Sequence, residues 1–159
     1  MVEAGRLEPC RTVEIGYGTG SDAIYLASRG FDVTAIDIAP TALAIAERRE
    51  EEAGVRVTWL LADVLNPPPL EAFDFAYDRG CYHEVRQHDP RAYVAAVKKL
   101  THTRSKILIL AACRKLLEAG HAGRVLAFSR APGPRVVSRR RFSNGKRFAE
   151  VPLTLLRRG

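Results

Sequence analysis

The sequence predicts an α/β fold with a mostly parallel central sheet flanked by helices. Between residues 11 and 112, short apolar runs alternate with segments that have the spacing of amphipathic helices. Such alternation is typical of βαβ units, because a crossover helix returns the chain to the same edge of a parallel sheet. The runs are almost entirely apolar, as expected of strands that are covered on both faces.

Each expected element has its own signals. We expect strands at 11–15, 31–36, 55–61, 73–77 and 107–112. We expect helices at 21–29, 41–53 and 91–100, with Ser21 as the N-cap of the first and Gly54 as the end of the second. Pro40 suits the first turn of that second helix. Its expected apolar face consists of Ala42, Leu43, Ile45 and Ala46. The proline-rich stretch 66–69 is expected to be a loop.

The pattern is weaker beyond Cys113. There the sequence suggests a helix at 114–119, a strand at 125–128, an irregular stretch at 132–141 and a last strand or hairpin at 148–156. A chain of 159 residues has room for one domain. We therefore expect a single domain with its core at about 11–112 and a basic C-terminal part at 113–159.

The positive charge is concentrated at the C-terminal end. The net charge of the chain is +7, but from Arg124 onward it has ten basic residues and one acid, Glu150, so the preceding part is slightly negative. A basic segment either contacts nucleic acid or another acidic partner, or is a solvated arginine-rich segment. We favour the second interpretation, because aromatic residues that would stack on bases are not interleaved with the arginines.

Composition also bears on where the protein is located in the cell and on whether it contains disulfides or a metal site. No apolar run approaches the roughly 20 residues that span a bilayer, and residues 1–10 do not resemble a secretory signal. Cys10, Cys81 and Cys113 are odd in number and widely spaced, which suits a reducing cytoplasm better than a disulfide framework. No cysteine or histidine spacing indicates a metal site.

The segment Glu14–Gly20 is the strongest functional signal. Gly16, Gly18 and Gly20 lie between an expected strand and an expected helix, where glycines allow a tight turn and close approach of a ligand. Their G-x-G-x-G spacing differs from the G-x-G-x-x-G of dinucleotide-binding proteins, which argues against NAD or FAD. No Lys-Ser/Thr pair follows, so a Walker phosphate loop is excluded. The alternative is a purely structural βα turn.

Two aspartates support the ligand-binding interpretation. Asp37 ends the second expected strand, where a carboxylate can accept both hydroxyls of a ribose. Asp63 follows the third expected strand and could accept from an adenine amino group. Each could instead be a helix-capping or turn residue. Because the carboxyl ends of parallel strands meet at one edge, the three features together predict one nucleoside-binding crevice.

These motifs resemble those of class I S-adenosylmethionine (SAM)-dependent methyltransferases. The resemblance is carried by Val13–Ile38, especially GSDAIYLA at 20–27 and FDVTAID at 31–37. The stretch FDFAYDRGCYH at 73–83 resembles the fourth motif, in particular that of thiopurine S-methyltransferase-like and tellurite-resistance-like enzymes. The similarity covers about residues 3–112. It implies a Rossmann-like methyltransferase fold and SAM as the cofactor.

The resemblance also implies roles for matching residues. Glu14 and the backbone of the glycine turn would surround the methionine part of SAM, the turn comprising Gly16, Tyr17, Gly18, Thr19 and Gly20. Asp37 would bind the ribose and Ile38 would pack on the adenine, whose edge Asp63 and Val64 would meet. Asp78 would lie near the amino-acid portion, and the acceptor would face Arg79, Tyr82 and His83. Tyr17 departs from the small residue or cysteine usual in the family, so its side chain either points outward or crowds the cofactor.

The residues after the fourth strand are the candidates for catalysis. His83 can change protonation near neutral pH, so it is the candidate base or acceptor-positioning group, unless it is only a surface histidine. Cys81 is expected to pack beneath the site. Arg79 and Tyr82 could shape a pocket for an anionic acceptor, although Arg79 could equally pair with a carboxylate. The Asn66-Pro67-Pro68 stretch precedes the fourth strand, which separates it from the amine-methylating motif that it resembles.

The expected function is methyl transfer to a small molecule through a sulfur, selenium, tellurium or oxygen nucleophile. The alternatives are RNA methylation with help from the basic C-terminal part, or a SAM-binding or nucleic-acid-binding module without efficient catalysis. Relatives of this branch have a longer segment before the first strand, whereas about ten residues precede Thr12. We therefore expect shortened N-terminal and C-terminal parts, in a truncated chain or a minimal variant with an open cleft. In an open cleft, cofactor binding is a safer prediction than catalysis.

Overall fold

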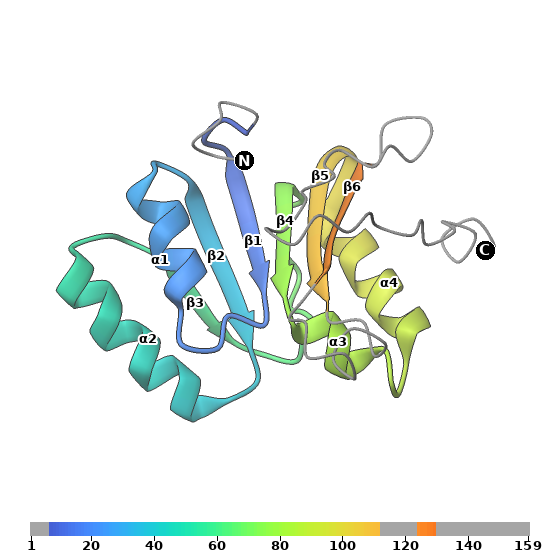
Figure 1. Cartoon of the computed structure of the whole chain (residues 1–159), viewed down its shortest axis with the longest axis horizontal. Coiled ribbons are helices and arrows are strands. Elements are labelled where there is room, and N and C mark those ends of the chain that lie inside the picture. Colours follow the sequence, from blue (N-terminus) through green and yellow to red (C-terminus); the bar gives the residue numbers. More distant parts are fainter. Residues whose placement is uncertain (1–6, 112–123, 130–159) are drawn as a thin grey trace, which may run out of the picture.

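The computed structural model describes residues 7–111 and 124–129, which form one six-stranded sheet with helices on both faces (Figure 1). The strands lie in the order β3-β2-β1-β4-β5-β6, and all pairs are parallel except β5 with β6. The strands are β1 (Arg11–Ile15), β2 (Asp32–Asp37), β3 (Thr58–Leu61), β4 (Phe73–Arg79), β5 (Thr101–Ala111) and β6 (Arg124–Ser129). The helices are α1 (Ser21–Ser28), α2 (Pro40–Ala53), α3 (Cys81–Val85) and α4 (Pro90–Leu100). The predicted α/β class is confirmed.

The order of the strands reverses between β1 and β4. From β1 the chain moves outward through β2 to β3, and then crosses back to pair β4 with the other side of β1. Ile15, the last residue of β1, pairs with Ile36 on one side and Asp78 on the other. In open α/β sheets a ligand crevice forms at the carboxyl ends of the strands where the order reverses. The topology therefore places the ends of β1, β2 and β4 around one such point.

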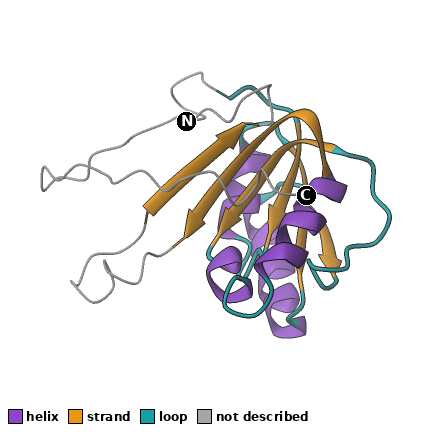
Figure 2. Ribbon diagram, turned by 90° about the vertical axis from the view of Figure 1, so that its right-hand side faces the viewer, coloured by secondary structure: helices purple, strands orange, loops and turns teal. Residues whose placement is uncertain are grey.

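Alternate side chains of the strands pack against different helices. On one face, Val33 and Ala35 of β2 belong to a core with residues of α1 and α2, including Ala23 and Ala46. On the other face, the core consists of Val13, Ile15, Ile36 and Phe73 with Tyr93, Val97 and Leu100 of α4. The sheet has the usual twist, which is visible in Figure 2 from the side of α4. Burial on both faces explains why the strand sequences are apolar.

Several boundaries differ from the prediction. Gly20 caps α1 with φ 76° and without a side-chain cap, and Ser21 is the first helical residue, so the prediction of Ser21 as N-cap is wrong. The backbone at this point requires a positive φ, which favours glycine. β3 begins only at Thr58, and β5 begins at Thr101, directly after α4. In α2, Ala46 is buried, but Ile45 is 37% exposed and does not belong to the core.

Some elements were not predicted or lie outside the described residues. The short helix α3 has no sequence signal of its own, because its five residues are too few to show a periodicity. A strand predicted at 125–128 is confirmed as β6, which pairs with β5 in antiparallel fashion. The predictions for 114–119, 132–141 and 148–156, and Cys113, fall outside the described residues. Within the described part of the chain, no helix is long and apolar enough to cross a membrane.

Candidate functional site

The glycine turn follows β1 at the carboxyl edge of the sheet. Gly16, Gly18 and Gly20 have φ values of 73°, 52° and 76°. A Cβ on Gly16 would lie 2.5 Å from the Cβ of Cys81, and one on Gly20 would lie 2.6 Å from the Trp59 ring. Two of the three positions therefore require glycine for close approach as well as for the left-handed backbone. The turn is packed tightly against α3 on one side and against β3 on the other.

Tyr17 occupies a position within this turn, but its side chain belongs to the core. It is 4% exposed and contacts the Trp59 ring edge-on, with 4.9 Å between the ring centroids. The side chain does not point outward, so that alternative drawn from the sequence is wrong. A cofactor at the turn would meet mainly the backbone of Tyr17.

Asp37 ties the end of β2 to the glycine turn. Its Oδ2 accepts a hydrogen bond from the backbone N–H of Gly18 at 2.8 Å, and its Oδ1 accepts one from Ala39 at 2.9 Å. A carboxylate oxygen has a second lone pair, so each can still accept from a hydroxyl. The neighbouring Ile38 is 69% exposed, which leaves an apolar side chain uncovered beside the carboxylate. The two residues have the placement expected of a ribose ligand and an adenine contact.

Arg49 of α2 donates hydrogen bonds to the end of the glycine turn. Its Nη1 donates to the Thr19 carbonyl at 3.1 Å, and to the hydroxyls of Thr19 and Ser21 at 2.8 Å each. These bonds join α2 to the start of α1. Sequence reasoning missed this contact, because Arg49 lies in a charged run of an amphipathic helix where no local pattern distinguishes it.

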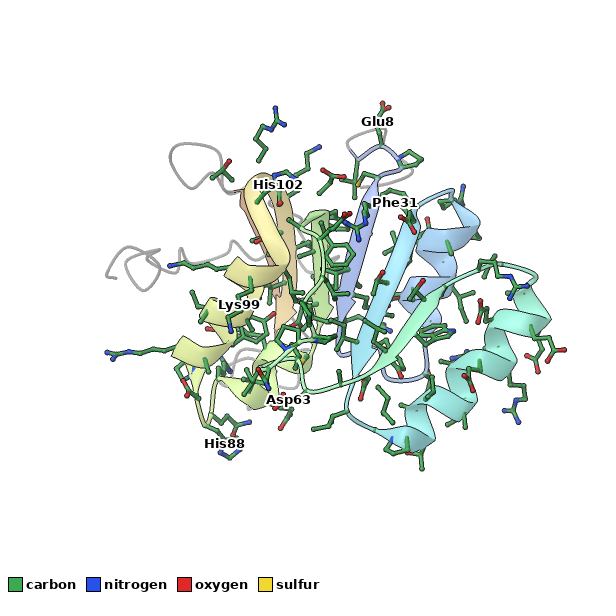
Figure 3. The ribbon with its side chains drawn as sticks, turned by 180° about the vertical axis from the view of Figure 1, so that it is seen from behind. Glu8, Phe31, Asp63, His88, Lys99 and His102 are labelled. Carbon is green, nitrogen blue, oxygen red and sulfur yellow. The ribbon has the colours of Figure 1, made fainter. Side chains whose placement is uncertain are left out.

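Asp63 and Val64 follow β3 and have different environments. Asp63 is exposed, and its Oδ1 accepts from the backbone N–H of Leu65 at 2.8 Å, as in an aspartate turn. Figure 3 shows Asp63 and His88 at the lower end of the molecule, where the strands have their carboxyl ends, and Glu8 and His102 at the upper end. Val64 is only 8% exposed and belongs to the core on the α4 face. Asp63 thus has the turn role that the sequence left open as its alternative, and its contact with an adenine stays a prediction, whereas the buried Val64 can offer only its backbone.

Glu14 is a buried acid next to the glycine turn. It is 2% exposed, and its Oε2 has no hydrogen-bond partner among the described residues. Burial, and secondarily the charge of Asp22, raise the pKa of Glu14 to about 8, although nearby Arg79 opposes the shift. A buried carboxyl oxygen without a partner is costly. It suits a cationic group, such as the ammonium of an amino acid, and so this observation fits the methionine part of SAM.

Arg79 and Asp22 form an ion pair beside Glu14. The Nε of Arg79 lies 2.5 Å from Oδ2 of Asp22, and the hydroxyl of Tyr77 donates to the same oxygen at 3.2 Å. The Arg79 side chain is 57% exposed and that of Asp22 is 25% exposed. The sequence left open whether Arg79 faces an acceptor or pairs with a carboxylate. The structure shows the pairing.

Asp78 lies inside the core on the opposite face. It is 1% exposed, and its Oδ2 accepts from the backbone N–H of Tyr82 at 2.9 Å and from the hydroxyl of Tyr93 at 2.5 Å. Burial raises the pKa of Asp78 to about 6, against the lowering effect of these hydrogen bonds. These contacts of Oδ2 anchor α3 to β4 and α4. Oδ1 is buried and has no hydrogen-bond partner among the described residues, and the expectation that Asp78 lies near the amino-acid portion of the cofactor stays a prediction.

The helix α3 carries the remaining candidates past the end of β4. Tyr82 packs against the Tyr93 ring, with 4.9 Å between the centroids. His83 is half-buried, and its Nδ1 lies 3.2 Å from Nη2 of Arg86. Cys81 packs against Gly16, as expected. Burial, with a smaller effect of Asp78, raises the pKa of the Cys81 thiol to about 12, so it is protonated and poorly nucleophilic near neutral pH.

The environment of Cys81 also shows which carboxylates lie together. Asp37 and Asp63 are both close enough to contribute to its raised pKa. The carboxylates at the end of β2 and just after β3 are therefore near enough for their charge to act on Cys81 of α3. Among residues 7–111 and 124–129, no group of three histidine, cysteine or acidic side chains could hold a metal ion.

Known proteins share both this sequence pattern and this fold. The model of a methyltransferase domain family matches residues 13–104. The magnesium-protoporphyrin O-methyltransferase of Rhodobacter capsulatus is 33% identical over 98 residues, which are 61% of this chain and 43% of that protein. The probable SAM-dependent methyltransferase TehB of Haemophilus influenzae is 24% identical over 113 residues, which are 70% of this chain and 40% of that protein. The chain thus spans about two fifths of the length of these relatives.

Solved structures agree. The structure of TehB from Haemophilus influenzae superposes with a TM-score of 0.61 at 25% identity, over 69% of this chain and 38% of that one. A Burkholderia thailandensis 1,6-didemethyltoxoflavin-N1-methyltransferase, solved with that compound and S-adenosylhomocysteine, superposes with a TM-score of 0.57 at 26% identity, over 69% of this chain and 48% of that one. The Rossmann-like fold and the expected family are therefore confirmed. Because the family model covers more than half of its residues, the chain belongs to the methyltransferase domain family, whose cofactor is SAM.

Proposed function

We propose that this chain binds SAM at the carboxyl edge of its sheet and transfers the methyl group to a small-molecule acceptor. The observation that carries the proposal is the convergence of the glycine turn, Asp37 and the buried, unpartnered oxygen of Glu14 at the point where the strand order reverses. A glycine turn alone would be a weak signal. Together, the three features offer a backbone cradle, a hydroxyl acceptor and an acid for an ammonium.

The proposed cofactor contacts follow from these positions. The backbone of Gly16–Gly20 and Glu14 hold the methionine part, and Asp37 accepts from the ribose hydroxyls. The exposed side chain of Ile38 covers one face of the adenine, and Asp63 with the backbone of Val64 lies at its edge. Asp78 is a positioning residue, because its buried carboxylate contacts α3 and Tyr93.

The chemistry requires alignment more than acid–base catalysis. SAM supplies a methyl group that is already activated by its sulfonium. The protein has to hold the acceptor in line and limit the access of water. His83 of α3 is the proposed base or positioning group, since it lies on the segment that leaves the end of β4. A thiol or a similarly acidic acceptor would need little help with losing its proton.

The proposed acceptor is a small molecule with a sulfur, selenium, tellurium or oxygen nucleophile. The names of relatives support the size class and the oxygen option: besides the Rhodobacter enzyme, a ubiquinone biosynthesis O-methyltransferase of Xanthomonas axonopodis is 31% identical over 110 residues. RNA methylation has less support, because aromatic residues that would stack on bases are not interleaved with the arginines from Arg124 onward.

A turnover assay tests this function. The native chain is incubated with SAM and a panel of small thiols, selenols, oxyanions and phenols, and formation of S-adenosylhomocysteine is measured. Turnover with at least one acceptor is expected, and His83→Ala should reduce the rate about 100-fold if His83 removes a proton. His88→Ala is the matched control, because His88 is exposed in the turn between α3 and α4 (Figure 3). Equal rates for both variants would eliminate a catalytic role for His83.

A further inference from the structure

A group of charged and polar side chains lies on the α1 side of the sheet, where β1 and β4 end. We call it the zwitterion cluster, and it consists of Glu14, Asp22, Tyr77 and Arg79. Glu14 and Tyr77 are paired across β1 and β4, and successive strand residues alternate between faces, so their side chains project from the same face. Asp22 belongs to the first turn of α1, two residues after Gly20. The cluster therefore adjoins the glycine turn directly.

The guanidinium of Arg79 is held in place through one of its three nitrogens. Asp22 engages its Nε, and Tyr77 donates to the same carboxylate oxygen, so the acid is fixed on two sides. Within the described part of the chain, the two terminal nitrogens of Arg79 have no partner, and more than half of the side chain is exposed. Those two nitrogens can bind one carboxylate with two parallel hydrogen bonds.

Glu14 supplies the complementary half of the cluster. The charges of Asp22 of α1 and Arg79 of β4 both act on it, and its buried Oε2 has no partner among the described residues. An ammonium bound beside Glu14 would stabilise the ionised carboxylate that burial otherwise disfavours, and the adjacent guanidinium attracts an anion. The arrangement is complementary to an α-amino acid, whose ammonium and carboxylate are separated by a single carbon.

We propose that Arg79 binds the carboxylate at the amino-acid end of the cofactor, and that Asp22 is the positioning residue that aims the guanidinium. This inference rests on the proposed function, and it changes the role of Arg79 from the acceptor side, where the sequence resemblance places it, to the cofactor side. The ion pair with Asp22 directs Arg79 toward α1 and Glu14, whereas His83 lies on α3. Arg79 then selects SAM over adenosine compounds that lack the carboxylate.

Ligand truncation tests the proposal without a known acceptor. Calorimetry measures the binding of S-adenosylhomocysteine and of its decarboxylated analogue, which retains the amine and the nucleoside. For Arg79→Gln we expect at least a tenfold loss of affinity for S-adenosylhomocysteine and less than a threefold loss for the decarboxylated analogue. The reason is that the variant loses charge-assisted hydrogen bonds to the carboxylate, which only the first ligand has. Asp22→Asn should show the same selectivity with a smaller loss, and Arg79→Lys should be intermediate.

Controls separate this selectivity from a general effect on folding. Arg48→Gln removes a cation that is 72% exposed and pairs with Glu52 within α2, so neither affinity should change. Thermal unfolding of each variant is measured in parallel. An equal loss for both ligands in Arg79→Gln would mean a structural role and would contradict the proposal.

Two further outcomes of these measurements would also contradict the proposed role of Arg79. Unchanged cofactor affinity in Arg79→Gln, with a raised KM for the acceptor, would assign Arg79 to the acceptor and overturn the inference while leaving the proposed function intact. If the native chain binds neither ligand, the proposed function itself fails, and this inference fails with it.

Discussion

Two regions of the carboxyl edge are built in different ways. The glycine turn with the end of β2 is shaped by neighbouring chain segments: the glycines adopt left-handed backbone, and Asp37 bonds to Gly18 and Ala39. The end of β4 with α3 depends on distant residues, since Asp78 is bonded to Tyr93 of α4, and Arg79 to Asp22 of α1. In the proposed site, the first region would hold the ligand with its backbone and the Asp37 carboxylate, whereas the second presents side chains positioned by residues that are distant in the sequence.

This difference indicates which region is suited to the cofactor that the family shares and which is suited to specificity for the acceptor. Backbone amides and glycines tolerate few substitutions, so the turn is suited to one constant ligand. Side chains of α3 such as His83 can be exchanged without rebuilding the sheet, so this short helix is suited to variable contacts.

The largest expected effect is in the glycine turn. Gly16→Ala should lower the free energy of unfolding by about 2–4 kcal/mol, because the substitution combines a positive φ with a clash. Its Cβ would meet the Cβ of Cys81 at 2.5 Å. Gly18→Ala is the matched control, since its φ is also positive but nothing lies within 4 Å of a Cβ there. Urea unfolding measures both, and equal losses would show that Cys81 packing does not constrain the turn.

The second effect is a pH dependence that originates at Glu14. The folded-state pKa, about 8, lies above the unfolded value of 4.5, so folding favours the protonated form. Stability from this group is therefore complete below pH 4.5 and declines as the pH rises toward 8. The free energy of unfolding of the native chain should fall by a few kcal/mol (about 1.4 per pKa unit) relative to Glu14→Gln across that range. Parallel pH profiles of the two proteins would contradict the assignment.

The next effect is at the end of β4. Tyr93→Phe removes the hydroxyl that donates to the buried Asp78 and should cost about 1–3 kcal/mol, since the carboxylate loses a charge-assisted bond. Ligand affinity should weaken less than in the glycine-turn variants, because Tyr93 acts only through α3. Chemical unfolding and calorimetry measure the two quantities. A greater loss of affinity than of stability would show that the two regions are more tightly coupled than proposed.

The smallest expected effect concerns Arg49. Arg49→Gln weakens the link between α2 and Thr19 and should reduce the affinity for S-adenosylhomocysteine about two- to fivefold, as the exposed bonds only preorganise the turn. Arg48→Gln, at the preceding residue, should leave this affinity unchanged. Faster hydrogen exchange of the Gly18 and Thr19 amides in Arg49→Gln alone would identify preorganisation as the cause. No difference between the variants would remove Arg49 from the site.

The same division explains how much could be predicted from the sequence. The fold and the placement of Gly16–Gly20, Asp37 and Asp63 follow from local patterns, because strand ends and turn glycines have short-range signals. The burial of Asp78 and of the Tyr17 side chain could not be predicted, since Tyr93 and Trp59 reach them through the folded core. Arg49 and Asp22 had no signal either, because a charged residue on a helix gives no indication of its partner.

The central claim is that the carboxyl ends of β1 and β2 bind SAM. Calorimetric titration of the native chain with S-adenosylhomocysteine, alongside Asp37→Ala, tests it most directly. We predict binding to one site in the native chain and at least a tenfold weaker affinity in the variant, which loses the acceptor for the ribose hydroxyls. Undiminished binding by the variant would overturn the ribose assignment alone, whereas absence of binding to the native chain would contradict the central claim.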